Sequence, residues 1–123
     1  MESPLYGTEW RLVALGGEQI AAADARARVT LQLFAEADTA AGHGGARASG
    51  RSGCNRYVGG VQIEGAAIAF SAIASTRMAC PPPQMELAAR YLAALAAATR
   101  WSMRDNALLL EGDGAALRFV AAV

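Results

Sequence analysis

Two cysteines are the residues of this chain with the widest choice of chemistry, and each lies in a segment rich in turn-forming residues. Cys54 lies in segment 49–59, which reads SGRSGCNRYVG, and Cys80 ends segment 75–80, which reads STRMAC. In an oxidising compartment two cysteines in one small domain tend to pair, and closing this loop would stabilise the fold by about 3.5 kcal/mol. Two buried free thiols that pack as small apolar groups are the alternative.

A catalytic thiol or a zinc site would need partners that the sequence hardly offers. His43 is the only histidine, and a thiolate nucleophile needs such a base beside it. Arg56 and Arg77 could lower the pKa of a thiol, but arginine accepts no proton. A zinc site made from Cys54, Cys80 and His43 would lack the short ligand spacing that such sites show. We therefore expect no enzyme activity, no bound metal and no cofactor.

Arg56, Arg77 and Glu86 form a second candidate cluster, this time of charges. A guanidinium can bond a carboxylate through two parallel hydrogen bonds, so we expect Arg77 to pair with Glu86 where the helix meets the sheet. In the alternative interpretation, Arg56 and Arg77 together face the carboxylate or phosphate of a ligand.

The other polar and glycine residues of the two segments are typical of turns. We expect Asn55 to bond the backbone of its own loop or to adopt a left-handed conformation, and Thr76 to act in a similar way. Gly50, Gly53 and Gly59 are interpreted as turn or bulge positions.

Length and charge narrow the range of partners. The chain has 123 residues, which predicts one domain over 1–123 with its core over about 9–121. Eleven arginines and eleven acidic residues give a formal net charge of zero, and the charges are scattered. No basic stripe exists to bind phosphates, so we expect no nucleic-acid partner. No segment is long and apolar enough to span a membrane, so we expect a soluble monomer without a signal peptide.

Alternating apolar residues predict a series of short strands joined by glycine-rich turns. The expected strands are 10–15, 29–34, 46–52, 61–63, 68–70, 101–103, 107–110 and 117–121. Gly59 and Gly60 are expected to interrupt the chain before the fourth strand, and segment 71–79 is expected to be less regular. Stretch 36–46 is small, polar and glycine-rich, which is typical of a loop.

One helix is predicted over residues 84–98, after three prolines that favour a helix start. Its apolar residues follow the three-and-four spacing of an amphipathic helix. Seven or eight antiparallel strands tend to curl, and one helix can cover an open end. The predicted fold is therefore α+β, a partly open antiparallel β-barrel with one main helix.

These segments together resemble the META domain, also called the HslJ-like heat-shock family. The resemblance rests on residues 10–12, 50–59, 68–70, 75–80, 108–110 and 117–119, which cover almost the whole chain. The residues that match its motifs, in a structural role, are Gly50, Gly53, Asn55, Arg56, Tyr57, Gly59, Thr76, Arg77, Met78 and Glu86.

The resemblance implies a cracked β-barrel with a helix and no enzymatic activity. It implies a small module of the bacterial cell envelope, periplasmic or anchored as an outer-membrane lipoprotein, whose relatives are linked to heat shock and novobiocin tolerance. The expected role is binding or structural support under envelope stress or in drug tolerance, with an envelope protein as partner. Any membrane contact would come through a lipid anchor that this chain lacks. The alternative is a carrier that holds an acyl chain or drug in an apolar groove between helix and sheet.

Overall fold

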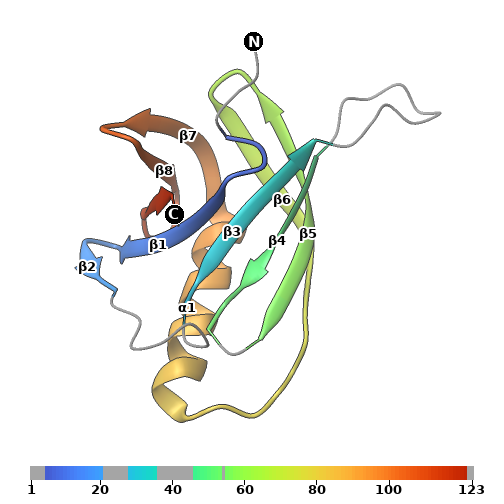
Figure 1. The fold of residues 1–123 in the computed structure, drawn as a ribbon, viewed down its shortest axis with the longest axis vertical. Coiled ribbons are helices and arrows are strands. Elements are labelled where there is room, and N and C mark those ends of the chain that lie inside the picture. The colour runs from blue at the N-terminus through green and yellow to red at the C-terminus, as the bar shows by residue number, and fades with distance from the viewer. Residues whose placement is uncertain (1–4, 21–27, 36–45, 54, 122–123) are drawn as a thin grey trace, which may run out of the picture.

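The structure, a computed structural model, describes residues 5–20, 28–35, 46–53 and 55–121 (Figure 1). This part of the chain forms nine strands and one α-helix. Their bounds are β1 Glu9–Leu15, β2 Glu18–Gln19, β3 Thr30–Ala35, β4 Ala46–Arg51, β5 Arg56–Glu64, β6 Ala67–Ser75, α1 Pro82–Ala97, β7 Ala98–Arg104, β8 Ala107–Gly112 and β9 Leu117–Ala121.

Eight of these strands close into an antiparallel barrel. The strand order runs from β1 through β3, β4, β5, β6, β7 and β8 to β9, and β9 pairs back onto β1, while the short β2 pairs with β1 alone. The predicted antiparallel barrel with one helix is therefore confirmed. Its thinnest seam lies between β6 and β7, where Ala67 and Arg100 are the one pair in register among the described residues. The Trp101 N–H bonds the Ala66 carbonyl beside that pair, at 2.9 Å.

Side chains that alternate along the strands fill the interior of the barrel. Inward positions are apolar, as expected for strands with one buried face. Outward positions are polar or small, apart from exposed apolar side chains such as Phe34, Val58 and Met103. The largest fully buried side chains are Tyr57, Tyr91, Phe119, Leu5, Leu15, Leu31, Leu33, Leu95, Leu108, Leu110, Leu117 and Val29. Trp10 joins this core, and Trp101 packs against its edge.

Helix α1 covers the lower end of the barrel in the view of Figure 1. It begins with prolines in its first two positions, where the missing N–H groups cost no helical hydrogen bond. Tyr91, Ala94 and Leu95 form its buried face. The helix starts two residues before the predicted 84 and ends one residue before the predicted 98.

The expected break at Gly59 and Gly60 is wrong, because β5 runs through both residues. A Cβ at Gly59 would lie 3.1 Å from Ile73 Cγ1 and 3.2 Å from the Ser71 carbonyl oxygen. The register shifts between Val58 and Gly60, and Ala72 opposite has a φ of 51°. These glycines therefore allow a close approach of β6, which itself extends to Ser75 where the sequence predicts less regular chain.

Candidate functional site

A buried pair of tyrosines, Tyr57 of β5 and Tyr91 of α1, lies against the inner side of strands β3, β4 and β5. The Tyr57 hydroxyl donates to the Thr30 carbonyl oxygen at 2.7 Å and lies 2.5 Å from the Tyr91 hydroxyl. The two rings pack edge to face, with centroids 5.7 Å apart. Burial raises the pKa of the Tyr57 hydroxyl and that of the Tyr91 hydroxyl above the ordinary value for tyrosine. Both tyrosines are therefore neutral hydrogen-bonding groups at physiological pH, and they brace helix α1 against β3 and β5.

Gly50 makes this cluster sterically feasible. A Cβ on Gly50 would lie 2.1 Å from the Thr30 carbonyl oxygen and 3.0 Å from the Tyr57 hydroxyl. Only a residue without a side chain allows β4 to pass this close to the hydrogen-bonded group. Gly50 therefore lies within a strand, at a point of close approach, whereas Gly53 has a φ of 115° and does occupy a turn.

Asn55 joins the two segments that contain the cysteines. Its Oδ1 accepts the Met78 N–H at 2.7 Å and the Thr76 hydroxyl at 3.0 Å, and its Nδ2 donates to the Met78 carbonyl at 3.3 Å. The Thr76 hydroxyl in turn accepts the Arg56 N–H at 3.1 Å. The sequence predicted a bond from Asn55 to its own loop, but its side chain bonds a segment more than twenty residues away. The alternative, a left-handed backbone, stays a prediction, because residue 54 lies outside the described part of the chain. Thr76 likewise bonds across segments.

The predicted Arg77–Glu86 ion pair is also wrong. Both side chains are exposed, and the ion pairs of the described residues do not include them. The ion pair between helix and sheet in the described part of the chain is instead Arg90 with Glu18 of β2, at 3.1 Å. An exposed pair of this kind contributes little to stability. Asn55 holds the segment before the helix without help from a charge.

The thiol predictions fall partly outside the described residues. Cys80 is disulfide-bonded, but Cys54 and His43 lie outside the described part of the chain, so their pairing and contacts stay predictions. Within the described residues no group of three or more His, Cys, Asp or Glu side chains is placed to hold a metal ion. In the same part of the chain, no helix is long and apolar enough to cross a membrane.

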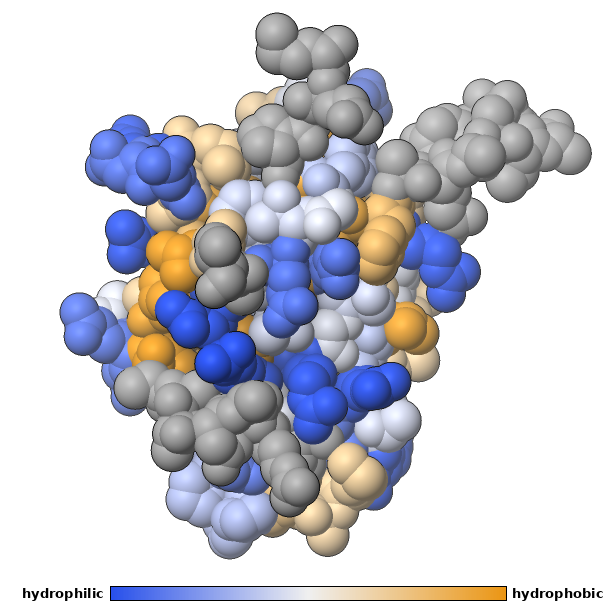
Figure 2. Space-filling view, in the orientation of Figure 1, coloured by the Kyte–Doolittle hydropathy of each residue, from blue (hydrophilic) through white to orange (hydrophobic). Residues whose placement is uncertain are grey.

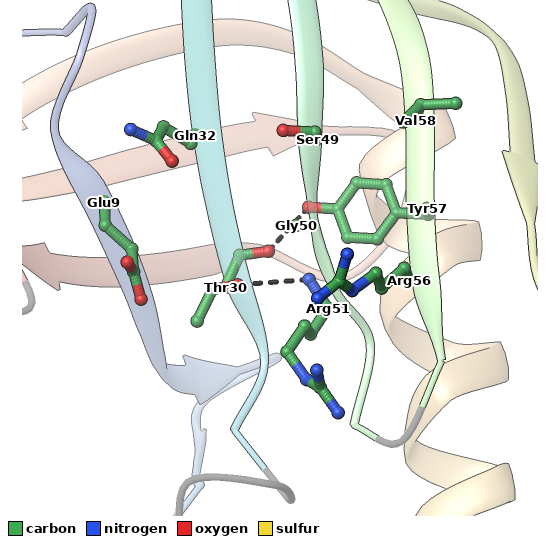
Figure 3. Close-up of a pocket in the computed structure, with 9 residues that line it drawn as sticks. All are labelled: Glu9, Thr30, Gln32, Ser49, Gly50, Arg51, Arg56, Tyr57 and Val58. Carbon is green, nitrogen blue, oxygen red and sulfur yellow. Dashed lines mark hydrogen bonds between the residues drawn. The ribbon is translucent and has the colours of Figure 1, made fainter.

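The outer side of strands β3, β4 and β5 contains a hollow of about 320 Å³ (Figure 3). It is lined by residues from four neighbouring strands: Glu9, Thr30, Gln32, Ser49, Gly50, Arg51, Arg56, Tyr57 and Val58. Arg51 of β4 and Arg56 of β5 are direct partners in the ladder and enter the hollow together from one side, while Glu9 of β1 lies at the other. Hydrophilic side chains also gather over the middle of the face shown in Figure 2.

The two guanidiniums in this hollow have no acidic partner among the described residues. The Nε of Arg51 is buried without a hydrogen-bond partner, although the side chain as a whole is half-buried. Of the two arginines that the alternative interpretation placed before a ligand, Arg56 lines this hollow and Arg77 does not, and Arg51 lies there beside Arg56. The turn between β4 and β5 spans residues 52–55, and residues 51 and 56 flank it on either side. This symmetric placement is the sequence signal that could have identified the pair.

Two smaller hollows lie beside other elements. One lies across β5 from the first, over β5 and β6, and is mainly apolar around Val58 and Ala74. The other lies between β2 and α1 and combines Ile20 and Leu87 with the charged side chains of Glu18, Glu86 and Arg90. The second of these occupies the place where the sequence predicts an apolar groove, and it is not apolar.

Together these features define a small antiparallel β-barrel domain with a helical end cap and a cationic hollow on its outer wall. The chain belongs to the META domain family, whose family model matches residues 3–123. An NMR structure of a protein from Burkholderia xenovorans is similar, with 31% identity and a TM-score of 0.73, over 97% of this chain and 84% of that one.

A second NMR structure, 19% identical, matches with a TM-score of 0.68 over 98% of this chain and 96% of that one. At this identity it shows a shared fold alone. No curated protein matches the chain. The comparisons thus give family and fold, and they leave the function to be argued from the site.

Proposed function

We propose that this META domain is a non-catalytic binding module of the bacterial cell envelope, and that it binds with the outer face of β3, β4 and β5. The observation that carries this proposal is the outer hollow with its two arginines, neither of which has an acidic partner in the described part of the chain. The motif residues beneath it are engaged in internal hydrogen bonds. The fold therefore supports the two guanidiniums, and the exposed Arg56 and the half-buried Arg51 are available for a ligand.

The carrier of an apolar ligand is a second candidate, and the geometry favours it less. Core side chains fill the barrel, with Leu95 of the helix and Leu108 and Phe119 of the strands fully buried. The hollow between helix and sheet is bordered by Glu18, Glu86 and Arg90. An acyl chain would have to displace the core or lie against charges, both of which are unfavourable.

The envelope assignment rests on the family resemblance and on the state of Cys80. Disulfides persist in oxidising compartments such as the periplasm and are rare in the bacterial cytoplasm, and Cys80 is disulfide-bonded. A role under envelope stress or in drug tolerance follows from the resemblance. Fractionation of cells that express the native gene with a carboxy-terminal tag tests the compartment: recovery with the cytoplasmic fraction would contradict it.

Backbone amide NMR tests the binding face. The protein is titrated separately with sodium phosphate, with sodium acetate and with the neutral apolar probe N-phenyl-1-naphthylamine, at constant ionic strength. We expect saturable shifts for amides of β3, β4 and β5 with an anion, and none in the core with the apolar probe. Saturable shifts of Leu95 and Leu108 with that probe would favour the carrier. If none of the three compounds shifts the outer-face amides, the proposed binding face is wrong.

A further inference from the structure

The juxtaposition of Arg51 and Arg56 is unfavourable unless something negative lies between them. These residues are direct cross-strand partners in the antiparallel β4–β5 ladder, and both line the outer hollow. Like charges directly opposite each other destabilise a sheet. The acidic residue in the lining of the hollow is Glu9 of β1, which is separated from β4 by β3 and lies at the opposite edge. The positive pair is thus locally uncompensated within the described residues.

A donor of Arg51 is also left unused. The Nε atom of Arg51 is buried and has no hydrogen-bond partner among the described residues. A buried N–H without an acceptor is costly, and native proteins rarely leave one unless a ligand, ion or water completes it. The terminal nitrogens of the two guanidiniums are not buried in this way, and they are the donors that an oxyanion in the hollow reaches first; the Nε–H joins them only if the Arg51 side chain shifts.

The backbones that support both guanidiniums are fixed in place. The Arg51 N–H bonds the Thr30 hydroxyl at 3.0 Å, and the Arg56 N–H bonds the Thr76 hydroxyl at 3.1 Å. Beneath them, Tyr57 is held to the Thr30 carbonyl. Two donors on a hydrogen-bonded strand backbone bind a ligand with less loss of conformational entropy than two donors on a mobile loop.

We propose that Arg51 and Arg56 form an oxyanion-binding pair that receives one carboxylate or phosphate group of a small ligand. This inference rests on the proposed function and names the ligand chemistry of the same face. Planar guanidiniums match the oxygens of either group through paired hydrogen bonds. The Gln32 amide and the Ser49 hydroxyl also line the hollow, above the arginine pair in the view of Figure 3. Glu9 at the far edge repels a second negative charge, so the site favours a ligand with one anionic group over an extended polyanion.

The test compares dissociation constants for acetate, phosphate and pyrophosphate, measured by amide NMR at constant ionic strength. For a single anion at a partly open site we expect a value on the order of 1 mM. Whichever of acetate and phosphate binds more tightly identifies the ligand group. Arg56→Ala, which removes an exposed side chain, is expected to weaken that binding at least tenfold. Arg56→Lys keeps the charge but loses the planar fork, and a loss of at least threefold is expected. Glu9→Gln should tighten pyrophosphate binding severalfold.

The matched control is Arg118→Ala, which removes one exposed positive charge on β9, outside the hollow. Unchanged binding in Arg118→Ala beside weakened binding in Arg56→Ala supports the pair. Equal weakening in both would show general attraction between charges and would overturn it. Wild-type affinity in Arg56→Ala would also overturn the pair, yet anion-induced shifts in β3–β5 would then still support the binding face. Absence of any shift in the unmodified protein would instead refute the proposed function itself.

Discussion

The inner and outer sides of strands β3, β4 and β5 both carry polar groups, and the two sets differ in what they bond. Tyr57 points inward and bonds Thr30 and Tyr91, whereas its neighbour Arg56 points outward and has no acidic partner among the described residues. The two-residue period of a strand separates them onto opposite faces. Adjacent residues of one motif can therefore serve different purposes, with the inner one stabilising the fold and the outer one free to bind.

Replacement of Gly50 should produce the largest loss of stability. Gly50 contacts the buried tyrosine cluster on the inner side and also lines the outer hollow. In Gly50→Ala the new Cβ would overlap the Thr30 carbonyl oxygen, so β3 or β4 must move and the tyrosine cluster must open. We expect a loss of about 4 kcal/mol in the free energy of unfolding, measured by urea denaturation. The control is Gly60→Ala, whose Cβ would lie 3.3 Å from the Ser71 hydroxyl and 3.8 Å from the Ser71 carbonyl oxygen, without overlap. Similar stability losses in both variants would contradict the special role of Gly50.

Alkaline pH should lower the stability of the protein through the two buried tyrosines of the inner side. The pKa of the Tyr57 and Tyr91 hydroxyls is raised by burial above the ordinary value of 10.0. Below pH 10 both states are neutral; above it the unfolded tyrosines lose their protons first, so stability falls as pH rises. The slope is about 1.4 kcal/mol per pH unit for each tyrosine. In Tyr57→Phe the slope between pH 10 and pH 11 should be about half that of the wild type, and an unchanged slope would contradict this origin.

Asn55→Ala tests the junction between the two cysteine segments. It leaves the Met78 N–H and the Thr76 hydroxyl without their shared acceptor. Asn55 is 7% exposed, so water replaces these bonds poorly, and we expect a loss of about 2 kcal/mol. Thermal denaturation followed by circular dichroism measures it. Gln62→Ala, at an exposed position of β5, serves as the control and should change the melting temperature little. A small change in Asn55→Ala as well would mean that the two segments associate without this amide.

Local patterns were sufficient for most elements of the fold; the exceptions are the short β2 and the part of β5 that runs through Gly59 and Gly60. Alternation identified the strands, the three-and-four spacing with preceding prolines identified the helix, and Asp105–Asn106 marked a hairpin turn. Both turn residues have positive φ, 52° and 64°, as a two-residue hairpin with matching twist requires. These features depend on neighbours within a few residues, so a single sequence contains them.

The site depended on contacts that local patterns do not encode. Asn55 and Met78 become neighbours only because β5 and β6 pair, and a glycine such as Gly50 looks the same in a turn and at a close approach. Arg77 is near Met78 in the sequence but lies beyond the end of β6, outside the outer hollow. Arg51 reaches Arg56 because the β4–β5 hairpin aligns them. The register of that hairpin, rather than the motif, selects the pair.

Arg56→Ala gives the smallest expected effect on stability. It is also the most direct comparison of an outward residue with its inward neighbour, Tyr57. The Arg56 side chain is exposed and contacts no acid among the described residues, and its removal relieves repulsion from Arg51. We expect a change within about 0.5 kcal/mol, of either sign, whereas Tyr57→Phe, one residue along, should cost about 1–3 kcal/mol. That variant loses the bonds to the Thr30 carbonyl and the Tyr91 hydroxyl, and only the longer bond from Tyr91 to Thr30, at 3.4 Å, remains. Urea denaturation of both variants at neutral pH and low phosphate measures the difference. If Arg56→Ala is as destabilising as Tyr57→Phe, then Arg56 stabilises the fold and is not available to bind a ligand.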